Sequence, residues 1–275
     1  CKYTSADLRR YKEIYGWCNA CEAGVGTYQA TKMAERTHAQ DTGEILHMDH
    51  RINGKEIALA AVDDKSHYLM IKKLNGKRSE QHSKAMDGIL ANANKHQHQV
   101  KTVRTDNEPV LVAMQPDLNR RGIKTETCLV DGHERVIERQ MGILSQKRKI
   151  KFNQLHQEGI HMPGALTGHI LDISMMQDIN FSASTADGNT GRTPYEMWTG
   201  QKVDVVKHLK YSYGDRVWCN KPKIDQNNNT SPVELGICLY RTGNDGVWVV
   251  YMFDRMRAVP RKPIRLHTEG IIGVP

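Results

Sequence analysis

The sequence predicts an α/β core followed by a smaller β-rich module. Apolar runs mark short strands at 45–49, 57–62 and 68–74, and Asn53-Gly54 and Asp63-Asp64 suit the tight turns between them. Longer segments with apolar residues at helical spacing follow these strands. After residue 187 the pattern changes to short strands separated by turns rich in asparagine and glycine.

Helices and strands alternate in the predicted core from residue 79 onward. The pattern predicts a helix over 79–94, a strand at 100–105, a helical segment over 110–121 interrupted by Pro116, a strand at 123–127, and helices over 133–150 and 165–178. Three strands followed by helix, strand, helix, strand and helix is the order of a ribonuclease H-like α/β core. We expect this core to occupy residues 41–186.

The remaining part, residues 187–275, is predicted to be a linker helix and a β-rich C-terminal module. Thr193, Pro194 and Glu196 form a helix start, with an N-cap, a proline in the first turn and a glutamate three residues after the cap. Short strands are then expected at 216–219, 235–240, 247–253 and 257–259.

Composition limits the function classes. No apolar run approaches the roughly 18–20 residues of a membrane helix, and no signal-peptide hydrophobic region opens the chain, so we expect neither a membrane span nor a secretory precursor. Six scattered cysteines among 275 residues favour a reducing compartment. The formal net charge of +8 favours nucleic acid as a partner, although a solvated basic surface has the same composition.

Acidic residues fall where predicted strands and a helix can bring them together. Asp49 lies in the first strand, Asp106 directly follows the fourth, and Glu134 and Glu138 lie one turn apart near the start of the 133–150 helix. Such carboxylates are suitable ligands for Mg²⁺, and two ions about 4 Å apart assist in-line phosphoryl displacement. By spacing alone this signal is weak, and solvated acids at strand ends and on a helix face are the simpler explanation of the pattern.

Short motifs follow one another along the chain in a recognisable order. They are Cys18-Asn-Ala-Cys21, Leu46-His47-Met48-Asp49, Val62-Asp63-Asp64-Lys65-Ser66, Lys77-Arg78-Ser79-Glu80, Val103-Arg104-Thr105-Asp106-Asn107, Glu138-Arg139-Gln140-Met141, Gly191-Arg192-Thr193-Pro194-Tyr195-Glu196-Met197-Trp198-Thr199-Gly200 and Leu235-Gly236-Ile237-Cys238-Leu239-Tyr240. Together they resemble the integrase region of copia-type LTR retrotransposon Gag-Pol polyproteins.

The resemblance implies a ribonuclease H-like integrase catalytic core that joins the 3′ ends of element DNA to target DNA. It implies that Asp49, Asp106 and a third acid hold Mg²⁺ or Mn²⁺. Glu138 gives the better downstream match for this third acid, and Glu134 is the alternative register. The chain departs from the family pattern after Asn107, where Glu108-Pro109 stands in place of Gly-Gly-Glu.

The resemblance also implies further ligands and partners. Residues 1–40 resemble a truncated zinc module and linker, in which Cys18 and Cys21 are either two ligands of an incomplete Zn²⁺ site or two reduced thiols. DNA is the implied partner, a homo-oligomer is the implied active species, and the nucleus and cytoplasmic element particles are the implied locations.

Basic residues near the predicted third acid are candidates for binding the DNA backbone, although cations at a solvated helix end are equally expected. They are Arg139, Lys147, Arg148, Lys149 and Lys151. The main alternative to an integrase is a catalytically inactive, element-derived nucleic-acid-binding or structural protein. A ribonuclease that cuts RNA–DNA hybrids is a further one.

Overall fold

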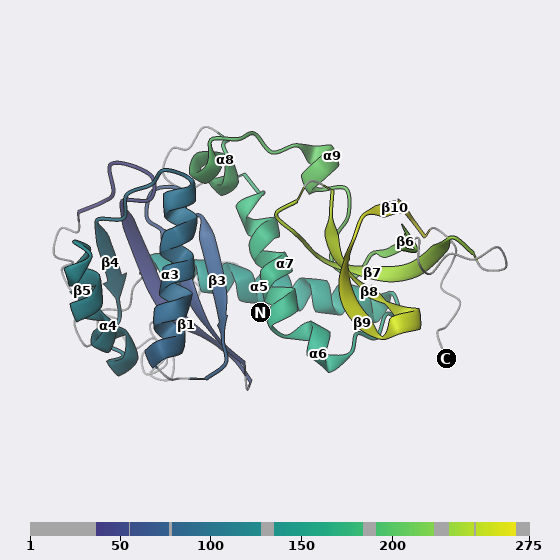
Figure 1. Cartoon of the computed structure of the whole chain (residues 1–275), viewed down its shortest axis with the longest axis horizontal. Helices are drawn as coiled ribbons and strands as arrows, with labels where there is room; N and C mark the ends of the chain where they lie inside the picture. The colour runs from purple at the N-terminus through teal and green to yellow at the C-terminus, as the bar shows by residue number, and fades with distance from the viewer. Residues whose placement is uncertain are drawn as a thin grey trace, which may run out of the picture. The chain divides into compact units, whose positions relative to one another are not determined.

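A mixed five-stranded sheet organises the first half of the chain (Figure 1). The structure, a computed structural model, describes residues 37–54, 56–76, 79–127, 135–183, 191–222, 231–244 and 246–267. The sheet has the order β3-β2-β1-β4-β5. Its strands are β1 (Ile45–Asn53), β2 (Glu56–Asp63), β3 (Leu69–Leu74), β4 (Thr102–Thr105) and β5 (Lys124–Thr127).

The strand directions are those of a ribonuclease H-like core. β1, β2 and β3 form an antiparallel meander, whereas β4 pairs parallel to β1 and β5 pairs parallel to β4. The antiparallel pairs need only tight turns, while each parallel pair needs a crossover, which here contains a helix. This arrangement confirms the fold class that the order of elements predicts.

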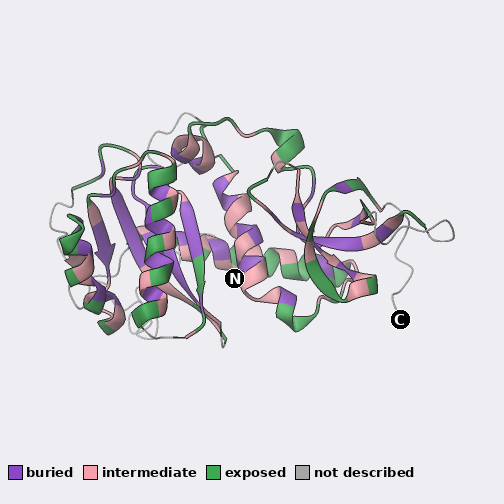
Figure 2. Cartoon of the chain, in the orientation of Figure 1, coloured by how far each residue is buried: buried purple, intermediate pink, exposed green. Residues whose placement is uncertain are grey.

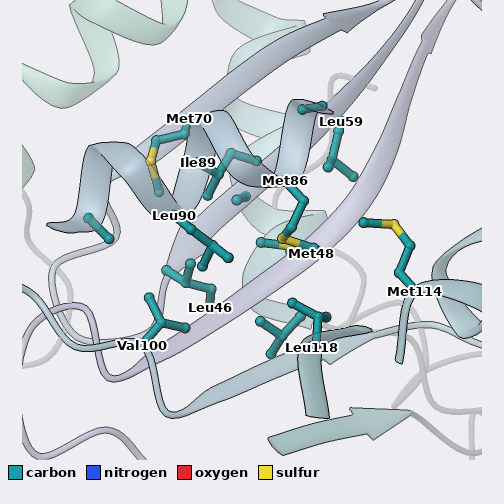
Figure 3. Packing of buried hydrophobic residues seen from close by; sticks show 14 of the residues in the cluster. Leu46, Met48, Leu59, Met70, Met86, Ile89, Leu90, Val100, Met114 and Leu118 are labelled. Atoms are coloured by element: carbon teal, nitrogen blue, oxygen red, sulfur yellow. The ribbon is translucent and has the colours of Figure 1, made fainter. Parts of the chain in front are cut away.

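Helices cover both faces of this sheet because side chains alternate along each strand. On one face, Leu46 and Met48 of β1 pack with Met86 and Ile89 of α3, as Figure 3 shows. On the other face, β2 contributes apolar residues to a second cluster that includes Ile137 of α5. The helices are α3 (Ser79–Lys95) and α4 (Pro109–Arg120) on the first face, and α5 (Arg135–Gln157) and α7 (His169–Asn180) on the second. Strands β1 and β2 are therefore largely buried (Figure 2).

The predicted 165–178 helix is divided in two at Gly168. The pieces are α6 (Gly164–Thr167) and α7. A Cβ atom at Gly168 would lie 1.8 Å from the carboxylate of Glu56, whose Oε2 accepts a hydrogen bond of 2.6 Å from the His169 N–H. Because this carboxylate from β2 satisfies a backbone donor in the first turn of α7, a glycine is needed where it approaches.

Two other helices also differ from the prediction. α5 continues to Gln157 rather than ending at residue 150, because Leu155 is buried in the second cluster and contacts Gly214. α4 continues through Pro116 without interruption, and the buried Met114 and Leu118 on either side of the proline hold it against the sheet. In both cases tertiary contacts outweigh the local signal.

The two aspartates of the turn at Asp63-Asp64 hydrogen-bond the segment that precedes β1. Asp63 accepts hydrogen bonds from the Gly43 and Ser66 N–H groups, both at 2.7 Å. Asp64 accepts from the Ala39 N–H at 2.7 Å and bonds His47 Nε2 at 2.8 Å. Although burial acts to raise the pKa of Asp64, the hydrogen bonds from His47 and Ala39 outweigh it and hold this pKa well below its usual range.

A second, antiparallel five-stranded sheet has the order β10-β6-β7-β8-β9. Its strands are β6 (Arg216–Asn220), β7 (Val233–Arg241), β8 (Trp248–Met252), β9 (Arg257–Arg261) and β10 (Pro263–Leu266), with the 3₁₀ turn η3 (Phe253–Arg255) before β9. The predicted β-rich module is therefore present, with β10 as an additional strand. Tyr213 and Leu239 join the cluster formed by α5 and α7, so the module packs on the core. The boundaries at residues 40 and 186 stay predictions.

The predicted linker helix is α8 (Pro194–Thr199), and a short helix α9 (Val205–His208) follows it. The capping box is formed: the Thr193 hydroxyl accepts from the Glu196 N–H, and Glu196 accepts from the Thr193 N–H. Trp198 is buried, stacks on Tyr68 with ring centroids 5.0 Å apart, and donates from Nε1 to Asn92 at 2.9 Å. These contacts anchor α8 to the core. Within the described residues, no helix combines the length and apolar character needed to cross a bilayer.

Candidate metal centre

Asp49 and Asp106 meet at the junction of β1 and β4. The two strands run parallel with Met48 opposite Thr105, so the residue that follows each of these is an aspartate at the same level. Glu108 joins them as the N-cap residue of α4, with an extended backbone and no capping hydrogen bond from its side chain. One carboxylate oxygen from each of the three residues lies within 4.8 Å of the other two.

The electrostatics of this group favour a cation. All three residues are half-buried. Burial raises the pKa of Asp49, and the neighbouring carboxylates of Asp106 and Glu108 raise it further, against a hydrogen bond of 2.6 Å from the His50 N–H. Three partly exposed carboxylates are suitable ligands for a hard divalent ion such as Mg²⁺, which keeps some of its water. The residues present therefore fit the ion that the sequence predicts.

The third carboxylate in this group is Glu108 and not the predicted Glu138. Glu138 lies exposed in the first turn of α5, and Glu134 lies outside the described residues. Glu138 and Ser145 share one side of α5, since seven residues make about two turns. Ser145 Oγ accepts from Arg51 Nη1 at 2.9 Å, and Arg51 extends from the same face of β1 as Asp49. Glu138 is thus on the side of α5 that meets this face of the sheet, but outside the group.

Glu108 is not among the predicted acids, which lie in or directly after a strand or on a helix, because it belongs to the loop that leads into α4. The short loop after β4 brings its carboxylate back beside Asp106, and the Glu108 N–H donates to Asp106 Oδ1 at 3.3 Å. The signal in the sequence is a second acid two residues after Asp106, directly after a strand. Because the chain bends at Asn107, this spacing alone does not predict that the two carboxylates meet.

The five predicted DNA-binding residues are in different surroundings. Arg139 and Lys149 are exposed on α5. Arg148 is not available to a phosphate in this structure, because its Nε lies 3.2 Å from the buried Asp172 and its Nη2 donates to the Thr167 carbonyl at 3.0 Å. It ties α5 to α6 and α7 instead.

Lys147 and Lys151 also face the interior of the protein in part. Both are half-buried, and together with Arg241 they oppose the rise in the pKa of Asp178 that burial causes. This places the two lysines near a carboxylate of α7, one turn apart on α5. Among the five cations, Arg139 and Lys149 are therefore the residues that the described surface presents most openly.

Cys18 and Cys21 lie outside the described residues, so the predicted zinc module stays a prediction. The described cysteines, Cys219 and Cys238, are both buried in the second sheet, where burial raises the pKa of the Cys219 thiol to about 11. They are reduced thiols within an apolar cluster.

No family model and no curated protein matches this chain. The structure is similar to solved retroviral integrases. The catalytic core of BIV integrase is 18% identical and covers 57% of this chain and 93% of its own, with a TM-score of 0.41. The HTLV-2 integrase core in complex with magnesium is 16% identical and covers 58% of this chain and 99% of its own, with a TM-score of 0.43.

A simian T-cell lymphotropic virus intasome, solved in complex with PP2A regulatory subunit B56 gamma, is similar over a longer stretch. It is 14% identical and covers 86% of this chain and 81% of its own, with a TM-score of 0.46. With TM-scores below 0.5, these similarities assign no activity to this chain.

Proposed function

We propose that this chain is a metal-dependent DNA integrase of the copia type, a polynucleotidyl transferase that joins the 3′ ends of retrotransposon DNA to target DNA. One observation carries the proposal: Asp49 and Asp106, far apart in the sequence, are brought side by side with Glu108 within 4.8 Å. The ordered motifs of the sequence and the ribonuclease H-like sheet support the same function.

Asp49 and Asp106 would hold the divalent ions, Mg²⁺ or Mn²⁺, with Glu108 or Glu138 as the third carboxylate. When bound, such ions supply positive charge at the scissile phosphodiester and at the attacking and leaving oxygens. The protein then needs no covalent intermediate. Its carboxylates orient the ions, and the exposed Arg139 and Lys149 bind the DNA backbone through salt-dependent phosphate contacts.

The proposal includes the assembly and the location that the resemblance implies. The active species would be a homo-oligomer on DNA, acting in the nucleus after delivery in cytoplasmic element particles. Zn²⁺ bound by Cys18 and Cys21, with ligands from elsewhere, would belong to the N-terminal module.

A strand-transfer assay with Mg²⁺ or Mn²⁺ tests the function. Oligonucleotides with the element's terminal sequence are mixed with target plasmid and the full chain. We expect joined product from the wild type and a loss of roughly 100-fold or more in Asp106→Asn, because an electrostatic group at the reacting centre is removed. Equal product from both proteins would overturn the enzyme proposal.

Two matched variants identify the third carboxylate. Glu108→Gln and Glu138→Gln each remove one charge at nearly constant volume. We expect the larger loss of product in Glu108→Gln. A larger loss in Glu138→Gln would assign the third ligand to α5, as the family motif implies, and would leave the transferase proposal standing.

A second candidate is an inactive, element-derived nucleic-acid-binding protein. It is favoured by Glu108-Pro109 in place of Gly-Gly-Glu and by the position of Glu138 outside the carboxylate group. This candidate predicts salt-dependent DNA binding, weakened in Lys149→Ala, without joined product from any variant. Cleavage of an RNA–DNA hybrid without DNA joining would instead indicate a ribonuclease.

A further inference from the structure

Two buried histidines lie directly behind the carboxylate group. The side chain of His50, in β1, is 5% exposed, and His82, in α3, is fully buried. Their Nε2 atoms are 2.6 Å apart, and the rings meet edge to face with centroids 4.8 Å apart. The other ring nitrogen of His50, Nδ1, contacts Glu108 Oε2. The three side chains form a continuous line from the interior of α3 to the candidate metal centre.

These histidines occupy positions where an apolar residue is expected. His50 follows Met48 by two residues on the face of β1 that packs against α3, and His82 precedes the buried Ala85, Met86 and Ile89 on the inner side of that helix. A buried polar ring costs stability unless it is hydrogen-bonded, so an unneeded pair of imidazoles is a poor choice for a core. The contact of His50 with Glu108 links this buried pair to a half-buried carboxylate.

The contacts on both sides of the His50 ring orient it. Because the Glu108 carboxylate accepts, His50 Nδ1 donates to it. On the other side of the ring, Nε2 shares a hydrogen bond with His82 Nε2. With a partner at each ring nitrogen, the His50 ring is fixed in one orientation. His82 thus holds the ring of His50 from behind.

His50 contacts two of the three carboxylates. Its ring holds Oε2 of Glu108, and its backbone N–H donates to Asp49 Oδ1 at 2.6 Å. Glu108 makes no capping hydrogen bond with α4, although it stands at the N-cap position, which is consistent with a side chain directed elsewhere. A carboxylate has two oxygens, so Glu108 can remain bonded to His50 and still offer an oxygen to an ion.

We propose that His50, held by His82, is a positioning residue that orients Glu108 for binding of the divalent ion. The inference rests on the proposed function, since it requires that Asp49, Asp106 and Glu108 form the metal centre. Residues that hydrogen-bond metal ligands in this way typically change metal affinity by about 10- to 100-fold when they are mutated.

The test measures Mn²⁺ affinity of the full chain by the electron paramagnetic resonance signal of free Mn²⁺, with the apo melting temperature recorded for each variant. His50→Leu removes the bond to Glu108. His50→Asn keeps a donor near the position of Nδ1. Met86→Ala opens a cavity in the same core without touching a carboxylate, and so controls for lost stability. Asp106→Asn reports on the metal centre itself.

We expect His50→Leu to weaken Mn²⁺ binding by about 10- to 100-fold, His50→Asn to recover most of that loss, and Met86→Ala to bind like the wild type at a lower melting temperature. His82→Phe, which leaves the bond between His50 and Glu108 in place, is expected to weaken binding less than His50→Leu.

Two results would overturn the proposal in distinguishable ways. In the first, Asp106→Asn binds Mn²⁺ weakly, but His50→Leu binds it like the wild type or Met86→Ala is weakened as much as His50→Leu. This result would remove the positioning role of His50 and leave the metal centre standing. Unchanged affinity in Asp106→Asn would remove the metal centre, and with it both this inference and the proposed function.

Discussion

Charge crowding at the metal centre predicts that Asp49→Asn stabilises the protein in the absence of divalent ions. The Asp49 carboxylate has two acidic neighbours within 4.8 Å, and its pKa is raised by burial and by their charges. At this distance one pair of like charges costs about 0.9 kcal/mol in water and about 3.5 kcal/mol at an effective dielectric constant of 20. Asparagine removes this repulsion and keeps the oxygen that accepts from the His50 N–H.

Because these groups are half-buried, the gain in the free energy of unfolding of Asp49→Asn should lie between these limits, at about 1–3 kcal/mol. For a chain of this size this corresponds to a rise of roughly 2–12 °C in Tm. The size of the gain depends on pH. A raised carboxyl pKa means that the ionised form disfavours folding, so the gain is absent well below pH ~4, where both proteins carry neutral groups, and appears as pH rises through the folded-state pKa of Asp49.

Differential scanning calorimetry of both proteins in EDTA and in Mg²⁺ measures the effect. Mg²⁺ at about 100 times its dissociation constant should stabilise the wild type by about 2.7 kcal/mol and the variant by much less. Asp254→Asn, at an exposed aspartate outside the group, is the control and should change stability by less than about 0.5 kcal/mol. An Asp49→Asn protein that is less stable than the wild type in EDTA at neutral pH would show that charge repulsion does not dominate at this site.

Three further predictions concern the fold around the site. Gly168→Ala should destabilise the protein by about 1–3 kcal/mol in urea unfolding, because its Cβ would displace the Glu56 carboxylate that caps α7. The matched variant Gly142→Ala has open space around it in α5 and should stabilise the protein by about 0.5–1 kcal/mol. Arg148→Ala should lower Tm with little change in the salt dependence of DNA binding, whereas Lys149→Ala should leave Tm nearly unchanged and weaken that salt dependence. Equal salt dependence in the two variants would contradict the assignment of Arg148 to the fold and Lys149 to DNA. The stability advantage of the wild type over Asp64→Asn should be full at neutral pH and shrink steadily as pH falls below about 4 towards the lowered folded-state pKa; an advantage of the same size at pH 7 and pH 2 would oppose it.

Sequence patterns predicted the core well where the signal is local. The apolar stripe of α3 and the alternating strands of the meander need only their own periodicity, and the capping box at Thr193 and Glu196 is read from four consecutive residues. The patterns failed where a partner lies far along the chain. Leu155 extends α5 because it contacts Gly214, and Gly168 divides a helix because Glu56 reaches it from β2.

At the candidate site, too, local patterns were informative and contacts with distant parts of the chain were not. The spacing of Asp49 and Asp106 on predicted strands is a weak signal by itself, and the resemblance of their motifs selects them; the parallel pairing of β1 with β4 brings them together. The path of a short loop decides that Glu108 turns back to them, and no periodic pattern encodes such a path. Similarly, the sequence predicts Arg148 as a DNA-binding or solvated cation and gives no sign of its ion pair, because its partner, Asp172, belongs to a different helix.

The location of bound Mn²⁺ is the strongest test of the proposed metal centre. Crystals of the full chain grown with Mn²⁺, measured with X-rays at its absorption edge, should show anomalous density within about 2.5 Å of carboxylate oxygens of both Asp49 and Asp106. Glu108 is the expected third ligand, through the oxygen that His50 leaves available. Full Mn²⁺ occupancy elsewhere, with no density between the two aspartates, would show that Asp49 and Asp106 do not form the metal centre.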